Sequence, residues 1–164
     1  MEKELVEFYK ELLLPEWDVW QEVKGVNPRT GERRRIDLII RHKERHNFTF
    51  GVECKRLDLN GYNQYSDWLK QMIIYTQVEW GQKKVRLPIL SCPSLAGGDD
   101  ACAYYALKRI AGKFGLGELS SEKRYNSDSY LLKVMMSDTI LWRTDNGFNE
   151  GQKNRDFTKL ITSL

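Results

Sequence analysis

Two acidic side chains and a lysine stand inside apolar segments of this sequence. Asp37 lies within Arg35–Ile40, and Glu53 and Lys55 lie within Phe50–Lys55. Because side chains alternate along a strand, Glu53 and Lys55 are expected to point to the same face. Charged groups inside apolar strands cost free energy unless they are paired or perform a task. The task that this set fits is holding a divalent metal next to a phosphate.

The chemistry of the donor groups predicts which metal this is. Hard carboxylate oxygens from Asp37 and Glu53, together with the backbone carbonyl of Cys54, suit Mg²⁺ or Mn²⁺. Such a metal would polarise a scissile phosphate, help to deprotonate a water and stabilise the leaving oxygen.

Positive charge gathers around these residues although the net charge of the chain is only +3. Between Lys24 and Arg56 there are ten Lys and Arg residues against four acids. Basic residues that neutralise phosphates are typical of nucleic-acid-binding proteins. The expected contacts to the DNA backbone are made by Arg33, Arg34, Arg35 and Arg56. A charged, solvated hairpin tip would give the same local excess, so both interpretations stay open.

The elements that must position these groups can be predicted from periodicity and turn residues. A helix over 3–14 ends at Pro15, and the turn 27–31 joins two strands into a hairpin because Asn, Pro and Gly supply its backbone angles. Three strands are expected over 17–24, 34–41 and 48–55, followed by a second helix over 63–80 and a fourth strand over 85–92. This order, α-β-β-β-α-β, predicts an α/β fold with a mixed central sheet flanked by helices.

The rest of the chain carries weaker signals. A helix from residue 99 or 100 to 114, a pair of strands over 129–143 that turns near 137–138, and a helix over 154–163 are expected. There is no internal repeat, low-complexity tract or linker, and 164 residues suit one domain. We therefore predict a single domain over 1–164, with a core over 2–92 and an α/β extension over 93–164.

The first helix places one acid on its apolar side. At 100° per residue, Glu2 shares a side with Val6, Tyr9 and Leu13, whereas Glu4 lies on the solvated side. Two interpretations are open: an inward-facing acid that joins the site, or a frayed helix end.

Asp37, followed by Glu53-x-Lys55 on the next strand, resembles the PD-(D/E)XK nuclease superfamily. This superfamily includes restriction endonucleases, Holliday-junction resolvases and RecB-like exonucleases. The resemblance covers about residues 2–92 and departs from the family at Ile36, where proline is usual. It implies a restriction-endonuclease-like αβββαβ core and hydrolysis of DNA phosphodiester bonds with Mg²⁺ or Mn²⁺. It also implies that Lys55 orients the attacking water or stabilises the charged transition state.

Two branches of the superfamily have further motifs with counterparts here. Residues 2–6 (EKELV) are similar to the E-R-x-L-V pattern of resolvases, which implies that Glu2 completes the metal shell or holds a second water. Gln71 and Tyr75 fit the Q-x-x-x-Y spacing of RecB-like enzymes, which implies that Gln71 positions Lys55 or contacts a phosphate. Tyr75 also fits a core stripe on its helix. The first pattern favours an endonuclease acting as a homodimer on junctions, and the second an enzyme acting on single strands or ends.

Two alternatives belong to other classes. The chain could be a non-catalytic nucleic-acid-binding protein on the same fold, or a structural domain in which Glu53 and Lys55 form a surface ion pair. The three cysteines include no C-x-x-C pair, so neither a disulfide nor a zinc site is indicated. No apolar run reaches the ~18 residues of a membrane span, and the N-terminus lacks a signal-peptide pattern. We therefore expect a cytoplasmic protein with DNA as its partner and no membrane association.

Overall fold

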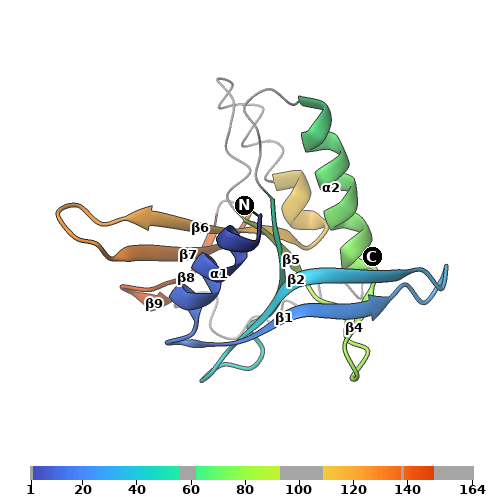
Figure 1. The fold of residues 1–164 in the computed structure, drawn as a ribbon, viewed down its shortest axis with the longest axis horizontal. Helices are drawn as coiled ribbons and strands as arrows, with labels where there is room; N and C mark the ends of the chain where they lie inside the picture. The colour runs from blue at the N-terminus through green and yellow to red at the C-terminus, as the bar shows by residue number, and fades with distance from the viewer. Residues whose placement is uncertain (1, 56–61, 93–108, 138, 150–164) are drawn as a thin grey trace.

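The computed structural model describes residues 2–55, 62–92, 109–137 and 139–149. In these ranges, helices pack on a single sheet (Figure 1). The elements in chain order are α1 (Glu2–Leu13), β1 (Trp17–Val26), β2 (Arg33–His42), β3 (Thr49–Cys54), α2 (Tyr62–Thr76), β4 (Glu79–Trp80), β5 (Ile89–Cys92), β6 (Leu116–Lys123), β7 (Tyr130–Met136), β8 (Thr139–Arg143) and β9 (Gly147–Phe148). A short helical segment over 109–113 precedes β6.

The sheet contains nine strands in the order β4-β1-β2-β3-β5-β6-β7-β8-β9. The strand β5 pairs in parallel with both β3 and β6, and the other neighbours are antiparallel. The sheet is strongly curled, so that its two antiparallel ends rise on either side of α1 (Figure 1). The predicted mixed α/β class is confirmed.

Each face of the sheet carries its own core. The concave face holds α1 through Tyr9 and Leu13, whose spacing of four residues puts both on one side of the helix. Leu38 of β2 and Trp142 of β8 belong to the same cluster, which therefore joins the two halves of the curled sheet. The other face is covered by α2, whose buried residues include Trp68, Met72 and Tyr75. Each fully buried large apolar side chain of this kind contributes about 1.5–3 kcal/mol.

Most predicted elements are present with shifted ends. The helix 63–80 was predicted too long: α2 ends at Thr76, and Trp80 lies in β4. The strand 85–92 was also too long, since β5 starts at Ile89 after Pro88. The expected pair of strands over 129–143 is confirmed by β7 and β8, and Ser137 after β7 has a φ of 55°, whereas residue 138 lies outside the described residues. The expected helical residues before 109 and the helix over 154–163 lie outside the described residues.

The strand β6 was not predicted, since the sequence indicated no element between the helix ending at 114 and the strands over 129–143. Gly115 has a positive φ of 75°, and the chain enters β6 directly after it. Gly117 belongs to the strand and pairs with Met136 of β7. A Cβ atom at this position would lie 2.3 Å from the carbonyl oxygen of Met135, so the close approach of the two strands requires glycine. The C-terminal region through β9 therefore continues the central sheet.

None of the helices within the described ranges is long and apolar enough to cross a bilayer. Cys54 and Cys92 are buried, and neither is in a disulfide.

Candidate active site

The strands β2 and β3 separate where the predicted metal ligands lie. Their last pair is Leu38 with Val52, so Asp37 and Glu53 are the first residues beyond it. From there β3 stays paired with β5, and β2 stays paired with β1 (Figure 1). The backbone N–H of Cys54 donates to Oδ2 of Asp37 at 2.8 Å. The Asp37 carboxyl group therefore lies across this fork and binds the end of β3.

The alternation of side chains along β2 is interrupted at Asp37. Ile36 and Leu38 are two residues apart, yet Ile36 packs in the cluster under α2 and Leu38 in the cluster under α1. The pairing of β1 with β2 skips Glu22 and Asp37, which lie between the pairs Gln21–Leu38 and Val23–Ile36, and Glu22 has a φ of 50°. A left-handed non-glycine residue costs about 1–3 kcal/mol. This kink in β1 accompanies the change of face in β2 at the site.

Glu53 is buried and held by a chain of hydrogen bonds from α2. Its side chain is 6% exposed, and Nε2 of Gln71 donates to its Oε1 at 2.7 Å. The same Nε2 donates to the hydroxyl of Tyr75 at 2.8 Å, and that hydroxyl donates to the carbonyl of Arg35 at 3.0 Å. Gln71 therefore contacts the carboxyl group itself, whereas the sequence predicted contact with Lys55 or a phosphate. Tyr75 is a core residue as expected and packs edge-on against Trp80.

Burial disfavours ionisation of both carboxyl groups, and the charge of Asp37 adds to this at Glu53. Burial, followed by the charge of Asp37, raises the pKa of Glu53 to about 8, against the opposing effects of the Lys55 ammonium and the Asp37 backbone. Burial also raises the pKa of Asp37, against the Cys54 N–H, Lys55 and Arg35. A bound cation would relieve the repulsion that Asp37 exerts on Glu53 and favour the ionised form of both groups. Lys55 follows β3 directly, with its N–H bound to the carbonyl of Cys92 at 2.8 Å.

Glu2 lies at the start of α1 with an exposed side chain. Its charge raises the pKa of both Asp37 and Glu53, so the helix begins close to the site. Among the described residues, however, no three His, Cys, Asp or Glu side chains are grouped so as to hold a metal. Glu2 is therefore not gathered with the other two acids as a third direct ligand in this structure.

A divalent cation nevertheless fits the residues present. Oε2 of Glu53 is buried and has no hydrogen-bond partner in the described part of the chain. Asp37 lies beside it at the fork, and Cys54, whose carbonyl is the third predicted ligand, ends β3 beyond the last pair with β2. Mg²⁺ commonly takes only one or two carboxylates from a protein and keeps several waters.

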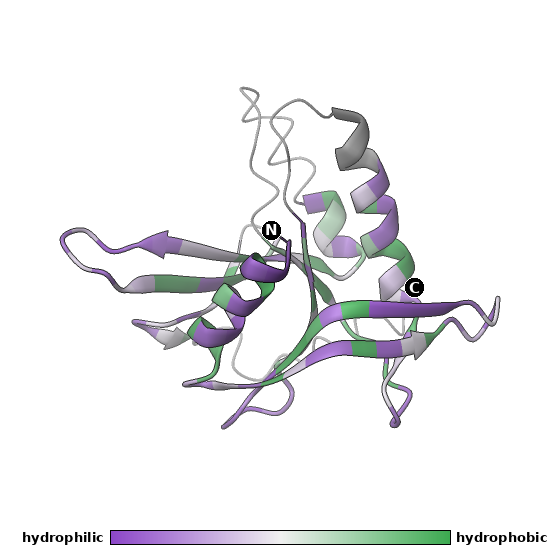
Figure 2. Cartoon of the chain, in the orientation of Figure 1, coloured by the Kyte–Doolittle hydropathy of each residue, from purple (hydrophilic) through white to green (hydrophobic). Residues whose placement is uncertain are grey.

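The predicted DNA-binding arginines differ in their surroundings. Arg34 is ion-paired with Glu32 at 2.6 Å, and Arg35 with Glu22 at 3.4 Å. Arg33 is exposed at the outer end of β2, where the strand changes from hydrophobic to hydrophilic (Figure 2). Arg56 lies outside the described residues.

Two polar residues next to Glu53 were missed by the sequence analysis. Ser91 of β5 is the register partner of Glu53, and Glu118 of β6 is the register partner of Ser91. All three are buried, with exposures of 6%, 0% and 3% in strand order. The available signal was a polar residue inside each of two apolar segments, 89–92 and 116–119.

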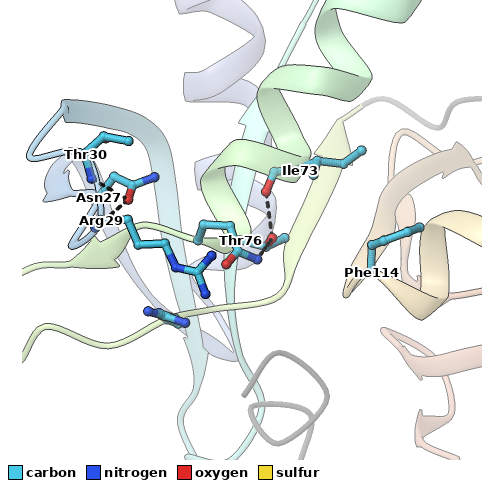
Figure 3. A pocket seen from close by; sticks show the side chains of 8 residues that line it. Asn27, Arg29, Thr30, Ile73, Thr76 and Phe114 are labelled. Carbon is cyan, nitrogen blue, oxygen red and sulfur yellow. Dashed lines mark hydrogen bonds between the residues drawn. The ribbon is translucent and has the colours of Figure 1, made fainter. Parts of the chain in front are cut away.

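A pocket of about 380 Å³ opens between the β1–β2 turn and the end of α2 (Figure 3). Its lining consists of Asn27, Arg29, Thr30, Ile73, Thr76, Gln77, Arg86 and Phe114, which include two arginines and no acid. Neither arginine is ion-paired within the described part of the chain. Because Ile73 and Thr76 lie about 200° and 140° around α2 from Gln71, the pocket is on the other flank of this helix from Glu53.

The fold and the site together define a mixed α/β protein in which a buried carboxyl group, that of Glu53, lies beside the half-buried carboxyl group of Asp37 at a fork in the sheet. No family model, curated protein or solved structure matches this chain.

Proposed function

We propose that this protein is a metal-dependent nuclease that hydrolyses DNA phosphodiester bonds. The observation that carries the proposal is the unpartnered, buried Oε2 of Glu53 beside Asp37. A buried carboxylate with a free oxygen and a second acid as neighbour is destabilised without a cation. Lys55 adds a positive charge that acts on both acids.

Each residue of the site has a separate task in this proposal. Asp37, Glu53 and the Cys54 carbonyl would hold Mg²⁺ or Mn²⁺, which supplies Lewis-acid activation of the phosphate and of water. The hydrogen bond from Gln71 fixes the orientation of Glu53, and the Cys54 N–H fixes that of Asp37. The Lys55 ammonium would stabilise the negative charge that develops on the phosphate.

The order of elements supports a restriction-endonuclease-like core. From α1 through β3, α2 and β5, the chain follows the αβββαβ order of that superfamily, apart from the short β4. The carboxylates stand at the carboxyl end of β3, which pairs in parallel with β5. Ligand sites in open α/β sheets occur at such strand ends. The continuation through β6–β9 is additional to the family pattern.

Basic residues near the hairpin support a nucleic-acid substrate. Arg33 and the pocket arginines Arg29 and Arg86 have no carboxylate partner within the described residues and can contact phosphates. An endonuclease acting on junctions or single strands is the favoured form. Action as a homodimer remains a prediction from the first-helix motif.

Cleavage assays test the proposal directly. Supercoiled, linear and four-way-junction DNA are incubated with Mg²⁺, Mn²⁺ or a chelator. We expect metal-dependent cutting of at least one substrate, lost in Asp37→Asn and Glu53→Gln and kept in Glu122→Gln, whose carboxylate is exposed. Absence of cutting under every condition, or equal cutting by the site variants, would overturn it.

The second candidate is a binding protein without catalysis. The position of the arginine pocket on the other flank of α2 favours it, because binding there does not require the carboxylates. Tight DNA binding that is independent of metal, with no cleavage, would select this function. The interpretation of Glu53 and Lys55 as a surface ion pair is wrong for Glu53, which is buried.

A further inference from the structure

Two unpartnered polar groups are neighbours in the sheet beside the carboxylate pair. Oε2 of Glu53 and Oγ of Ser91 are both buried and both lack a hydrogen-bond partner in the described ranges. Glu53 and Ser91 are register partners on the parallel strands β3 and β5. Adjacent strands lie about 4.8 Å apart, and paired residues point to the same face.

The packing one step earlier on these strands shows which face this is. Gly51 and Ile89 are the preceding partners of the same parity, and a Cβ atom on Gly51 would lie 2.7 Å from Cδ1 of Ile89. Ile89 belongs to the cluster under α2. Glu53 and Ser91 therefore project toward α2, where Gln71 binds the other oxygen of Glu53.

A group between the two orphan oxygens would satisfy both of them. Ser91 on β5 lies between its register partners, Glu53 on β3 and Glu118 on β6, so an acidic residue flanks it on each neighbouring strand. An anion is disfavoured between two acids, whereas a cation with its bound water is favoured. A serine hydroxyl is a hard oxygen donor of the kind that Mg²⁺ and Mn²⁺ accept.

We propose that the Ser91 hydroxyl contacts the coordination shell of the divalent cation held by Glu53, and so belongs to the metal centre. This inference rests on the proposed metal centre and adds a residue from β5 to it. Ser91 thus contributes to the affinity of the site for the cation and to its selectivity among metals. Its position explains why a serine is fully buried in an otherwise apolar strand segment.

Titration calorimetry with the full chain tests this role without measuring cleavage. We expect Ser91→Ala to weaken Mn²⁺ binding by about 10–100-fold, the usual effect of losing a residue that supports a metal ligand. Ser91→Cys should shift the preference from Mg²⁺ toward Cd²⁺, because a thiolate is a soft ligand. Ser120→Ala, a matched change on β6, should leave the affinity unaltered.

The outcomes separate this inference from the proposal on which it rests. If wild-type protein binds Mn²⁺ through Asp37 and Glu53 while both Ser91 variants bind it equally well, the role of Ser91 is refuted and the metal centre stands. If wild-type protein binds no divalent cation, the metal centre and the role of Ser91 fail together. Unfolding curves of each variant show whether it is folded, and the cysteine variant provides the test if the alanine variant is not.

Discussion

The two flanks of α2 lie beside charged side chains of opposite sign in different environments. On one flank, Glu53 is buried, accepts a hydrogen bond from Gln71 and lies beside Asp37. On the other flank, Arg29 and Arg86 line an open pocket with neutral polar neighbours (Figure 3). A single helix thus separates a buried acidic site from an exposed basic one.

The difference shows how burial decides what a charge can do. In the buried site, desolvation and repulsion raise the pKa of Glu53 to about 8, so the carboxyl group responds strongly to any cation placed beside it. In the pocket, solvent screens the arginines, so that they can bind phosphates with modest energy. The first arrangement suits chemistry on a phosphate, and the second suits holding a strand.

The largest expected effect concerns stability in the absence of metal. The pKa of Glu53 is raised from 4.5 to about 8 in the folded protein. Its stabilising contribution to the free energy of unfolding is therefore complete below pH 4.5 and is lost as pH rises through 8. Glu53→Gln removes this loss and keeps the contact with Gln71. We expect the free energy of unfolding of Glu53→Gln at pH 9 to exceed that of wild type by roughly 2–5 kcal/mol.

Urea unfolding in a chelator at pH 5, 7 and 9 measures this difference. The exposed variant Glu122→Gln serves as the control and should not show the gain at high pH. If wild type and Glu53→Gln have the same pH dependence, Glu53 does not titrate as a buried acid.

A smaller effect is expected from the residue that orients Glu53. Gln71→Met keeps the length of the side chain and removes its hydrogen bonds to Glu53 and Tyr75. We expect the cleavage rate to fall by about 10–100-fold, as for other residues that orient metal ligands. Gln82→Met, on an exposed turn, is the matched control. An unchanged rate in Gln71→Met would show that this bond has no role in the chemistry.

Removal of the Tyr75 hydroxyl should have a weaker effect still. Tyr75→Phe keeps the ring against Trp80 and loses the bonds to Gln71 and the Arg35 carbonyl. We expect a loss of about 0.5–1.5 kcal/mol in the free energy of unfolding. Thermal or urea unfolding at pH 6 measures it. No loss would mean that water replaces the hydroxyl in this network.

The smallest effects should come from the exposed flank. Arg29→Ala and Arg86→Ala should each lower the slope of log affinity for DNA against log salt by about 0.7–0.9. The cleavage rate at saturating DNA should remain that of wild type, because the pocket lies away from Glu53. Fluorescence anisotropy at several salt concentrations measures the slope, with Arg124→Ala on the β6–β7 turn as control. If the pocket variants had a lower cleavage rate at saturating DNA, the pocket and the carboxyl groups would act as one site.

The acids could be predicted from the sequence because the signal is local. Asp37 and Glu53 are charged residues in apolar strands, and Cys54, next to Glu53, lies on the opposite face in the α1 cluster, as alternation along a strand requires. The first helix and the hairpin follow from apolar periodicity and the Asn27–Gly31 turn, whose ends are joined by a hydrogen bond of 2.8 Å.

The remaining parts of the site depend on contacts between distant segments. Ser91 and Glu118 become neighbours of Glu53 only through the parallel pairing of β3, β5 and β6, and no local sequence pattern specifies that register. The kink at Glu22 depends on the strand opposite it, since a glutamate gives no signal for a positive φ. The partner of Gln71 depended on the packing of α2 against β3, which helical periodicity alone does not determine.

The central claim is that Glu53 and Asp37 together bind a divalent cation, and proton release on binding tests it most directly. At pH 7, a Glu53 with a pKa of about 8 is mostly protonated and must lose its proton to bind the metal. Calorimetric titration with Mn²⁺, in buffers of different ionisation enthalpy, should show release of close to one proton, and Glu53→Gln should release almost none. Absence of Mn²⁺ binding, or equal proton release by the variant, would contradict the claim.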